Sequence, residues 1–264
     1  IIGKLCGRLI GLMYHVIIIA KTRFGKGVGY VIPLCLRYKG SIVCNDLKGE
    51  NYTRTHRQRK KMGHNVYKFD PYDLIQDEYG QSCFNPLDYI QDGDPDSIAT
   101  ARQISKIIAS PHDSGDAFFT QYGEKIVTLY ILYVCAKCEQ NERNLGTVRY
   151  LLSRTGEEQQ AILDEMKTME NEFFGIIKTD GCKLMELRGD PTKPANNTIL
   201  GLLATADIMT AWLDDPRIKE SLSKTDFHPE MFRFEPSSLF IVVEPNKLDV
   251  CTLLIKIIYT LVIE

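Results

Sequence analysis

The sequence has no apolar run long enough to cross a membrane. The best candidates, residues 9–20 and 252–263, are only 12 residues long, and they contain His15 and Lys256, respectively. A transmembrane helix needs about 20 predominantly apolar residues. Both segments are therefore predicted to be core elements, and the chain itself is predicted to be cytosolic.

An excess of charge of one sign is also lacking, because 32 Lys and Arg residues face 34 Asp and Glu residues, for a net charge of −2. Contact with nucleic acid would therefore have to come from a local basic patch. Glycine (19), proline (11), hydrophobic residues (44%) and charged residues (25%) are ordinary for a globular protein. This excludes collagen-like and largely disordered chains, and 264 residues suffice for one domain with a second inserted in it.

Cysteine is too sparse for a disulfide scaffold, since eight residues are scattered among apolar segments and no signal peptide is visible. We expect reduced, buried thiols. Cys135 and Cys138 form a single CxxC with no second pair nearby. Two positions on one face of a buried helix explain this spacing better than a zinc site. No metal site and no catalytic triad are predicted.

The two ends of the sequence are unusual for a domain. The first residue is Ile1, and the last, Glu264, lies within an apolar segment. Domains usually end in polar, exposed segments. We therefore expect the chain to be part of a longer polypeptide.

The first part of the sequence alternates apolar runs with glycine-rich and polar segments, which is typical of a parallel α/β sheet. Strands are predicted over 14–20, 41–46 and 65–70. Residues 28–35 are predicted to begin as a helix that stops near Pro33, and a second helix is predicted over 51–61. Apolar residues then recur every three to four positions, which predicts helices through most of the middle of the chain.

A strand at 238–243 and a helix at 248–262 return the pattern to that of the first part. The predicted fold is an α/β domain interrupted by an all-α insertion. The expected boundaries are 1–96 for the first part of the α/β domain, 97–223 for the insertion and 224–264 for the return.

Residues 20–27 have the setting of a phosphate-binding loop, between a predicted buried strand and a predicted helix. Glycines let backbone N–H groups turn toward an anion, the helix N-terminus favours negative charge, and a lysine reaches the phosphates. Gly25 and Lys26 match the pattern GxxxxGK[ST], whereas Ala20 and Gly27 depart from it. On the pattern alone, a simple turn is an equal alternative.

Several ordered motifs together carry a stronger signal. They are TRFGKGVGYVIP (22–33), YKGSIVCNDLKGE (38–50), YKFDP (67–71), CFNP (83–86) and WLDDP (212–216). This series closely resembles the TraG/TraD-like coupling proteins of type IV secretion and conjugation systems, which are related to the FtsK/HerA translocases. Many members have the loop APTRxGKGVG, so Ala20 and Gly27 are family features, while Lys21 and Phe24 are departures.

The resemblance implies a RecA-like P-loop core with an inserted all-α domain, and an NTP-driven translocase that uses ATP and Mg²⁺. It also implies a homo-hexamer at the cytoplasmic face of the bacterial inner membrane. Its partners would be the secretion-channel components and the DNA or protein substrates that it feeds to the channel.

The resemblance further assigns residues to the nucleotide site. Lys26 would contact the β- and γ-phosphates. Gly25, Gly27 and Val28 would contribute backbone N–H groups, and Thr22 and Arg23 would shape the loop. Asp46, Lys48 and Glu50, in the family's DxKGE segment, would lie at the carboxyl end of a strand, where parallel sheets place ligands. The alternative for this segment is the N-terminal turn of a helix, where acidic residues are favoured.

Hydrolysis requires groups that position Mg²⁺ and the attacking water. In the resembling family, an apolar strand ending in Asp-Glu follows the last helix, and the sequence ends before it. We expect the chain alone to bind nucleotide weakly and not to turn it over. A truncated, non-hydrolysing docking module is the alternative. A small-molecule kinase is disfavoured by the helical middle and the DLKGE segment.

Residues 54–61 contain five Lys and Arg residues. In a helix, Arg54, Arg57 and Lys61 would share one face at positions i, i+3 and i+7. That spacing could follow DNA phosphates in a translocation channel. A solvated helix face is the simpler alternative.

Overall fold

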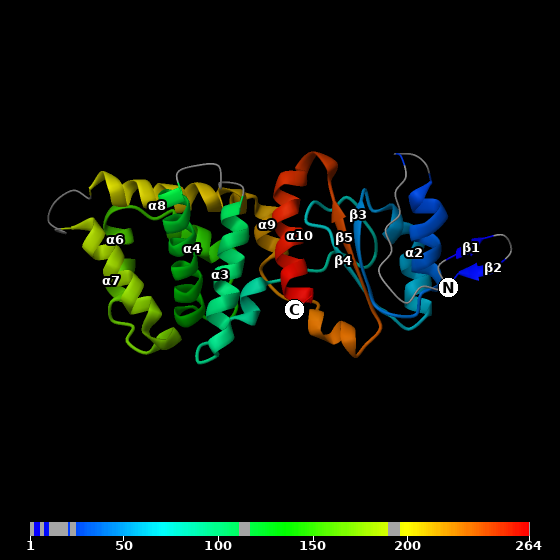
Figure 1. Ribbon diagram of the computed structural model, residues 1–264, viewed down its shortest axis with the longest axis horizontal. Helices are drawn as coiled ribbons and strands as arrows, with labels where there is room; N and C mark the ends of the chain where they lie inside the picture. Colours follow the sequence, from blue (N-terminus) through cyan, green and yellow to red (C-terminus); the bar gives the residue numbers. More distant parts are fainter. Residues whose placement is uncertain are drawn as a thin grey trace. The chain divides into compact units, whose positions relative to one another are not determined.

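The computed structural model describes residues 3–5, 8–10, 21, 25–110, 117–189 and 196–263 (Figure 1). The chain divides into two compact units. The α/β unit comprises Ile1–Ser82 with Phe227–Cys251, and the helical unit comprises Cys83–Asp226 with Thr252–Glu264. The strand predicted at 14–20, with His15, lies outside the described residues.

The α/β unit contains a three-stranded parallel sheet in the order β3-β5-β4. The strands are β3 (Ile42–Leu47), β4 (Asn65–Phe69) and β5 (Ser237–Val243). β5 is central, and all of its residues are buried (Figure 1). After its two initial serines, β5 is apolar at every position (239–243), which agrees with this burial, because a parallel strand covered on both faces needs no polar alternation. The predicted mixed α/β fold with a parallel sheet is confirmed.

Two helical segments precede and follow β3 in this unit. The π-helical turn η1 (Gly27–Val31) continues into α1 (Ile32–Arg37), and α2 spans Glu50–Lys61. The predicted helix end near Pro33 is wrong. Pro33 lies in the first turn of α1, where a missing N–H is tolerated, and the helix ends where Tyr38 becomes extended.

The remaining elements of the α/β unit are short. A two-stranded antiparallel hairpin joins β1 (Gly3–Leu5) to β2 (Arg8–Ile10). Two 3-10 turns flank β5, namely η6 (Pro229–Arg233) and η7 (Pro245–Lys247).

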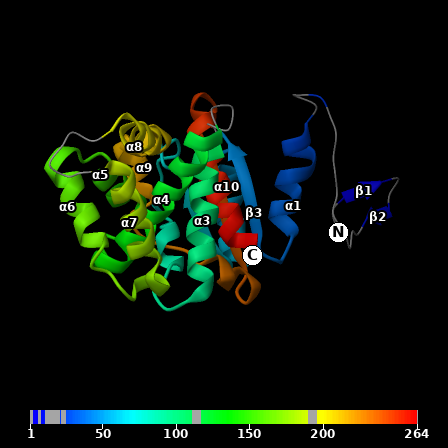
Figure 2. The ribbon, with the colours of Figure 1, turned by 60° about the vertical axis from the view of Figure 1, so that its left-hand side comes forward.

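The helical unit is built around α4 (Ala117–Lys137). Residues 126–135 of α4 are all buried, as expected for a helix that is apolar on every side. It packs against α3 (Pro95–Ala109), α5 (Leu145–Leu152), α7 (Ile176–Arg188) and α8 (Asn197–Thr210) (Figure 2). Cys135 is buried on α4, and Cys138 follows its end, half-buried.

The other elements complete the helical pattern predicted for the middle of the chain. They are η2 (Pro86–Tyr89), α6 (Gly156–Met166), η4 (Glu172–Gly175), η5 (Ala211–Asp214) and α9 (Pro216–Ser221). The last helix, α10, spans Leu248–Ile263. Across the described ranges, none of the helices combines the length and the apolar character needed to traverse a bilayer.

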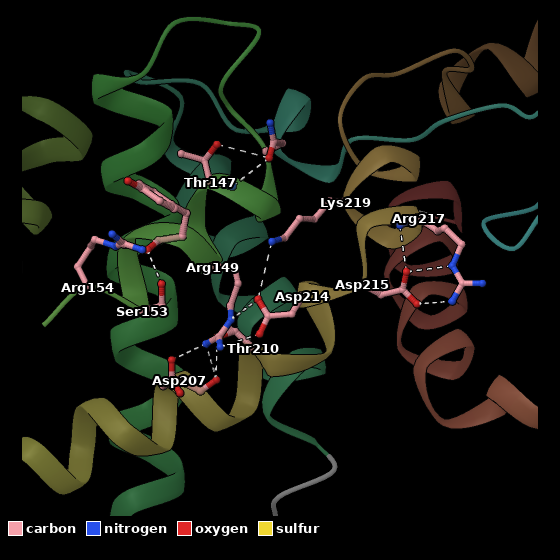
Figure 3. A network of polar contacts seen from close by, with 12 residues as sticks. Thr147, Arg149, Ser153, Arg154, Asp207, Thr210, Asp214, Asp215, Arg217 and Lys219 are labelled. Carbon is pink, nitrogen blue, oxygen red and sulfur yellow. Dashed lines mark hydrogen bonds and ion pairs between the residues drawn. The ribbon is translucent and has the colours of Figure 1, made fainter.

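Arg149 on α5 forms hydrogen bonds to two other elements of the helical unit, α8 and η5 (Figure 3). The side chain of Arg149, only 8% exposed, donates from Nε and Nη2 to the two carboxylate oxygens of Asp214, at 3.1 and 2.8 Å. Its Nη1 donates to the backbone oxygen of Asp207 at 2.9 Å. Hydrogen bonds from Arg149 hold the pKa of Asp214 below its usual range. This bidentate geometry fixes α5 against α8 and η5.

Candidate nucleotide site

The described part of the predicted phosphate loop is an exposed turn that opens a helix. Gly25 has φ +76°, and its oxygen accepts a hydrogen bond from Gly29 N at 2.7 Å. Residues 25–29 are all exposed. Apart from adjacent residues and the helix's own backbone, no heavy atom of the described residues lies within 4 Å of the place where a Cβ would stand on Gly25, Gly27 or Gly29. The described residues therefore leave room beside this backbone for a ligand.

Lys26 is the N-cap residue of this helix, directly before Gly27–Val31. The first N–H groups of a helix have no carbonyl one turn earlier to accept their hydrogen bonds, and they attract anions. Gly25, Lys26, Gly27 and Val28 thus have the setting that a phosphate group requires. Thr22 and Arg23 lie outside the described residues.

The same residues do not supply a magnesium site. Gly27 has no hydroxyl group where a P-loop serine or threonine would hold the ion. Among the residues that the structure describes, no cluster of three or more His, Cys, Asp or Glu side chains is arranged to bind a metal. The loop therefore fits the phosphates of a nucleotide and leaves Mg²⁺ without an identified ligand.

The DLKGE segment follows β3 and begins α2. Asp46 is 1% exposed, and its two carboxylate oxygens accept hydrogen bonds from Asn51 N at 3.1 Å and Tyr52 N at 2.7 Å. Burial raises the pKa of Asp46, and these two N–H groups oppose the shift. The carboxylate of Asp46 is thus committed to the first turn of α2, while the side chains of Lys48 and Glu50 are exposed.

The glycine of the DLKGE segment, Gly49, is required by the backbone conformation and by the packing around it. Lys48 and Gly49 have φ of +86° and +71°, which reverses the chain between strand and helix. A Cβ on Gly49 would lie 1.8 Å from Cδ1 of Ile75 and 2.7 Å from its Cγ1. Glycine is therefore required both by the left-handed backbone and by the packing of Ile75.

The five basic residues of α2 do not act as one patch. Arg54, Arg57 and Lys61 are exposed, as their helical spacing predicts. Lys60 places its ammonium group 3.0 Å from the ring centroid of Tyr79, a cation–π contact. Arg59 is fully buried.

Arg59 joins α2 to the end of α1 and to β5. Its Nε donates to Ser238 Oγ at 2.8 Å, and its Nη2 donates to Gly40 O at 2.7 Å. Its Nη1 donates to the backbone oxygens of Cys35, at 3.3 Å, and Tyr38. Burial lowers the pKa of Arg59. The sequence reasoning counted this residue only within the basic segment.

A signal for the burial of Arg59 was present in the sequence. Tyr52, His56 and Arg59 recur at spacings of four and three residues, which places them on one helix face. All three are buried. Their shared face opposes the exposed face that carries Arg57.

An ion pair between the buried Lys68 and the half-buried Asp77 orders the segment after β4. Lys68 is 2% exposed, and its Nζ lies 3.1 Å from Asp77 Oδ1. The hydroxyl of Tyr52 donates to Asp77 Oδ2 at 2.6 Å. The loop that contains Asp77 is thereby fixed to α2 and β4, which sequence reasoning missed because it assigned this segment no contacts.

Asp70, at the carboxyl end of β4, provides a test of this buried network. It is fully buried, Oδ2 accepts from Ile75 N at 2.9 Å, and Oδ1 has no hydrogen-bond partner among the described residues. Burial raises the pKa of Asp70. A carboxyl group with a raised folded-state pKa contributes stability at low pH that is lost as the pH rises through that pKa.

We therefore expect Asp70→Asn to increase the free energy of unfolding by about 1 kcal/mol at neutral pH, because the buried charge is removed. The difference should vanish below the ordinary pKa of aspartate. Urea unfolding between pH 3.5 and 8 measures it, with the exposed Asp73→Asn as control. Equal destabilisation at every pH would contradict the expectation.

The comparisons with known proteins agree with the motifs. The family model "Type IV secretory system Conjugative DNA transfer" matches residues 3–264. The chain belongs to this family. The resemblance to type IV coupling proteins found in the sequence is thereby confirmed.

The relatives in this family are much longer than the chain. Protein VirD4 of Rhizobium radiobacter is 28% identical over 270 residues, which cover 98% of the chain and 37% of the relative. Conjugal transfer protein TraG of Escherichia coli is 30% identical over 238 residues, covering 88% and 36%. The chain thus spans little more than a third of these relatives.

Among solved structures, the bacterial conjugative coupling protein TrwBdeltaN70 matches with a TM-score of 0.47 and 11% sequence identity. The match covers 85% of the chain and 50% of that protein.

Proposed function

We propose that the chain is the nucleotide-binding core of a type IV secretion or conjugation coupling ATPase that feeds DNA or protein substrates to a secretion channel. Family membership supports this proposal. The observation that carries it is the exposed turn at Gly25, followed at once by Lys26 at the start of a helix. In the proposal, the complete protein works as a homo-hexamer at the cytoplasmic face of the bacterial inner membrane, with channel components as partners.

The residues of the loop would bind and orient the nucleotide. Backbone N–H groups at Gly27 and Val28 would donate to phosphate oxygens, and the ammonium group of Lys26 would neutralise their charge. Asp46 would act indirectly, by holding the segment with Lys48 and Glu50 at the end of β3 through its hydrogen bonds to α2. Bound ATP would supply the phosphoryl group whose transfer to water drives movement.

The expected result of Lys26→Ala is a loss of nucleotide affinity of about tenfold or more, because a charge-assisted contact to phosphate is removed. Titration of the 264-residue chain with a fluorescent ATP analogue and Mg²⁺ measures this. Lys39→Ala, another exposed lysine of the same unit, is the matched control and should leave the affinity unchanged.

One outcome would count against the proposal, and a second would contradict a separate expectation for the isolated chain. Equal nucleotide affinity in the wild type and in Lys26→Ala would favour a docking module whose loop does not bind nucleotide. Robust ATP hydrolysis by the purified chain that depends on Lys26 would contradict the expectation that the chain alone does not turn over nucleotide.

In the same proposal, Arg54, Arg57 and Lys61 contact the phosphates of a DNA substrate. Their exposure on one face of α2 supports this assignment. Helix residues at these spacings are neighbours on the surface, so they can contact a continuous stretch of backbone.

A further inference from the structure

Two cysteines of the α/β unit, Cys35 on α1 and Cys44 on β3, have their thiol groups in contact. Figure 2 shows α1 next to β3. The helix α2 reaches both residues. Asn51 Nδ2 donates to Cys44 Sγ at 3.6 Å, and Arg59 Nη1 donates to the backbone oxygen of Cys35 at 3.3 Å. The two thiols are separate from the residues assigned to the nucleotide site.

The surroundings of the two thiols make them chemically unequal. The hydrogen bond with Cys44 lowers the pKa of Cys35, and the charge of Arg59 adds to this effect, while burial and the carboxylate of Asp46 oppose it. The same hydrogen bond raises the pKa of Cys44, and burial raises it further. Cys35 is therefore favoured as the thiolate, which is the nucleophilic form of cysteine, and Cys44 as the thiol that donates to it.

Other buried cysteines of the chain have the opposite character. Burial raises the pKa of Cys83 and Cys251 to about 11 and that of Cys135 to about 12. Among the described cysteines whose pKa is shifted, Cys35 is the only one with a lowered value. A cysteine with a low pKa next to a second, resolving cysteine is the arrangement of a redox-sensing pair.

The access of solvent to this pair is narrow. Cys35 is only 3% exposed. Cys44 is half-buried, and its Sγ lies 3.8 Å from the backbone oxygen of Asn45 at the surface. An oxidant that reaches Cys35 past Cys44 has to be small, which favours hydrogen peroxide over a bulky disulfide.

We propose that Cys35 and Cys44 are a peroxide-sensitive pair that closes to a disulfide and thereby controls the predicted phosphate loop. The thiolate of Cys35 attacks one oxygen of hydrogen peroxide, the O–O bond breaks and hydroxide leaves, so that Cys35 becomes a sulfenic acid. The sulfur of Cys44 then attacks the sulfur of Cys35, the S–O bond breaks, and water leaves with the proton of Cys44. The two sulfur atoms lose two electrons, and the peroxide is reduced to two molecules of water once hydroxide takes up the proton that Cys35 had released.

Control of the loop rests on the proposed function. The helical backbone runs from Gly27 through η1 into α1 as far as Arg37, so Cys35 belongs to the helix that begins directly after Lys26. Bond formation draws the two sulfur atoms from hydrogen-bonding contact to about 2 Å, and β3 is fixed by its pairing with β5. The displacement therefore falls on α1, and it shifts the N–H groups of Gly27 and Val28 that would bind phosphate.

Mass spectrometry of the 264-residue chain tests the disulfide directly. The chain is treated with hydrogen peroxide, its remaining thiols are blocked with N-ethylmaleimide, and it is digested with trypsin without reductant. The tryptic peptides 27–37 and 40–48 contain one cysteine each, Cys35 and Cys44. We expect these two peptides to be linked after oxidation and to be released by dithiothreitol.

Variants assign the roles of the two thiols. In Cys44→Ala, oxidation should stop at a sulfenic acid on Cys35, which dimedone labels. Cys138→Ala is the matched control, because it removes another half-buried thiol and should leave the link unchanged. Absence of the link from a chain that circular dichroism shows to be folded overturns the proposal. A link that forms equally fast in the urea-unfolded chain does the same, because the folded arrangement would then contribute nothing.

Titration with a fluorescent ATP analogue tests the effect on the loop. The oxidised chain should bind the analogue about fivefold or more weakly than the reduced chain, which is the lower end of typical coupling between two sites. Dithiothreitol should restore the affinity, and Cys35→Ala should not respond to peroxide. Equal affinity of the linked and the reduced chain overturns control of the loop. Absence of nucleotide binding in both forms counts against the proposed function instead, and the linked peptides alone then decide whether the thiol pair is a site of oxidation.

Discussion

Replacing Arg59 with methionine is expected to lower the free energy of unfolding by about 3 kcal/mol or more. The change removes donors from the backbone oxygens of Cys35, Tyr38 and Gly40 and from Ser238 Oγ. Arg59 is fully buried, so water cannot replace the lost hydrogen bonds without opening the fold. The effect should appear as a lower midpoint of urea unfolding with an unchanged slope.

Two opposing effects decide the sign of this result. Removing a buried charge relieves its desolvation, and replacing buried ions by apolar residues of similar size can even stabilise a protein. The charge of Arg59, however, is compensated by several backbone carbonyls, and methionine would leave all of them unsatisfied. Because each costs about 1–3 kcal/mol, the loss exceeds the gain.

Arg57→Met is the matched control, since it changes an exposed arginine on the same helix and should alter stability by less than about 0.5 kcal/mol. Arg59→Lys should restore only part of the loss, because a single ammonium group cannot reproduce the planar fork of the guanidinium group. If Arg59→Met were as stable as Arg57→Met, the hydrogen bonds of Arg59 would not hold α1 and β5 to α2.

The secondary structure of the α/β unit followed from local patterns. The strand predicted at 41–46 is Ile42–Leu47, and that at 238–243 is Ser237–Val243. β-branched apolar runs bounded by glycine or polar residues encode such strands locally. The order β3-β5-β4 could not be predicted. β5 inserts between two strands that lie about 170 and 200 residues earlier in the chain, through contacts that no local pattern records.

In the candidate site, too, local features could be predicted from the sequence and long-range contacts could not. Gly25 and Lys26 are candidates because phosphate binding requires those residue types at that spacing, and their role stays a prediction. The capping of α2 by Asp46 was only one of two alternatives, since either role places an acidic residue after a strand. The hydrogen bond from Arg59 to Ser238 could not be predicted, because the two residues are 179 positions apart along the chain.

In our proposal, the exposed face of α2, with Arg54, Arg57 and Lys61, contacts DNA. The test of this face therefore differs from the test of the buried Arg59. The double charge reversal Arg57→Glu/Lys61→Glu is expected to weaken binding of a fluorescent DNA duplex by about tenfold or more at low salt. The physical reason is the loss of two contacts that release counterions from DNA. The slope of log affinity against log salt should also decrease, by about 1.8 for two phosphates.

Fluorescence anisotropy between 50 and 200 mM salt measures both quantities. The matched control is Arg37→Glu/Lys39→Glu, which changes two other exposed residues of the same unit and alters the net charge equally. Equal losses in the two double variants would mean that DNA senses only overall charge. Unchanged affinity in Arg57→Glu/Lys61→Glu would leave this helix face as solvated surface. A loss of affinity confined to Arg57→Glu/Lys61→Glu would assign DNA binding to the exposed face of α2. The opposite face of α2, which carries the buried Arg59, is held against the sheet.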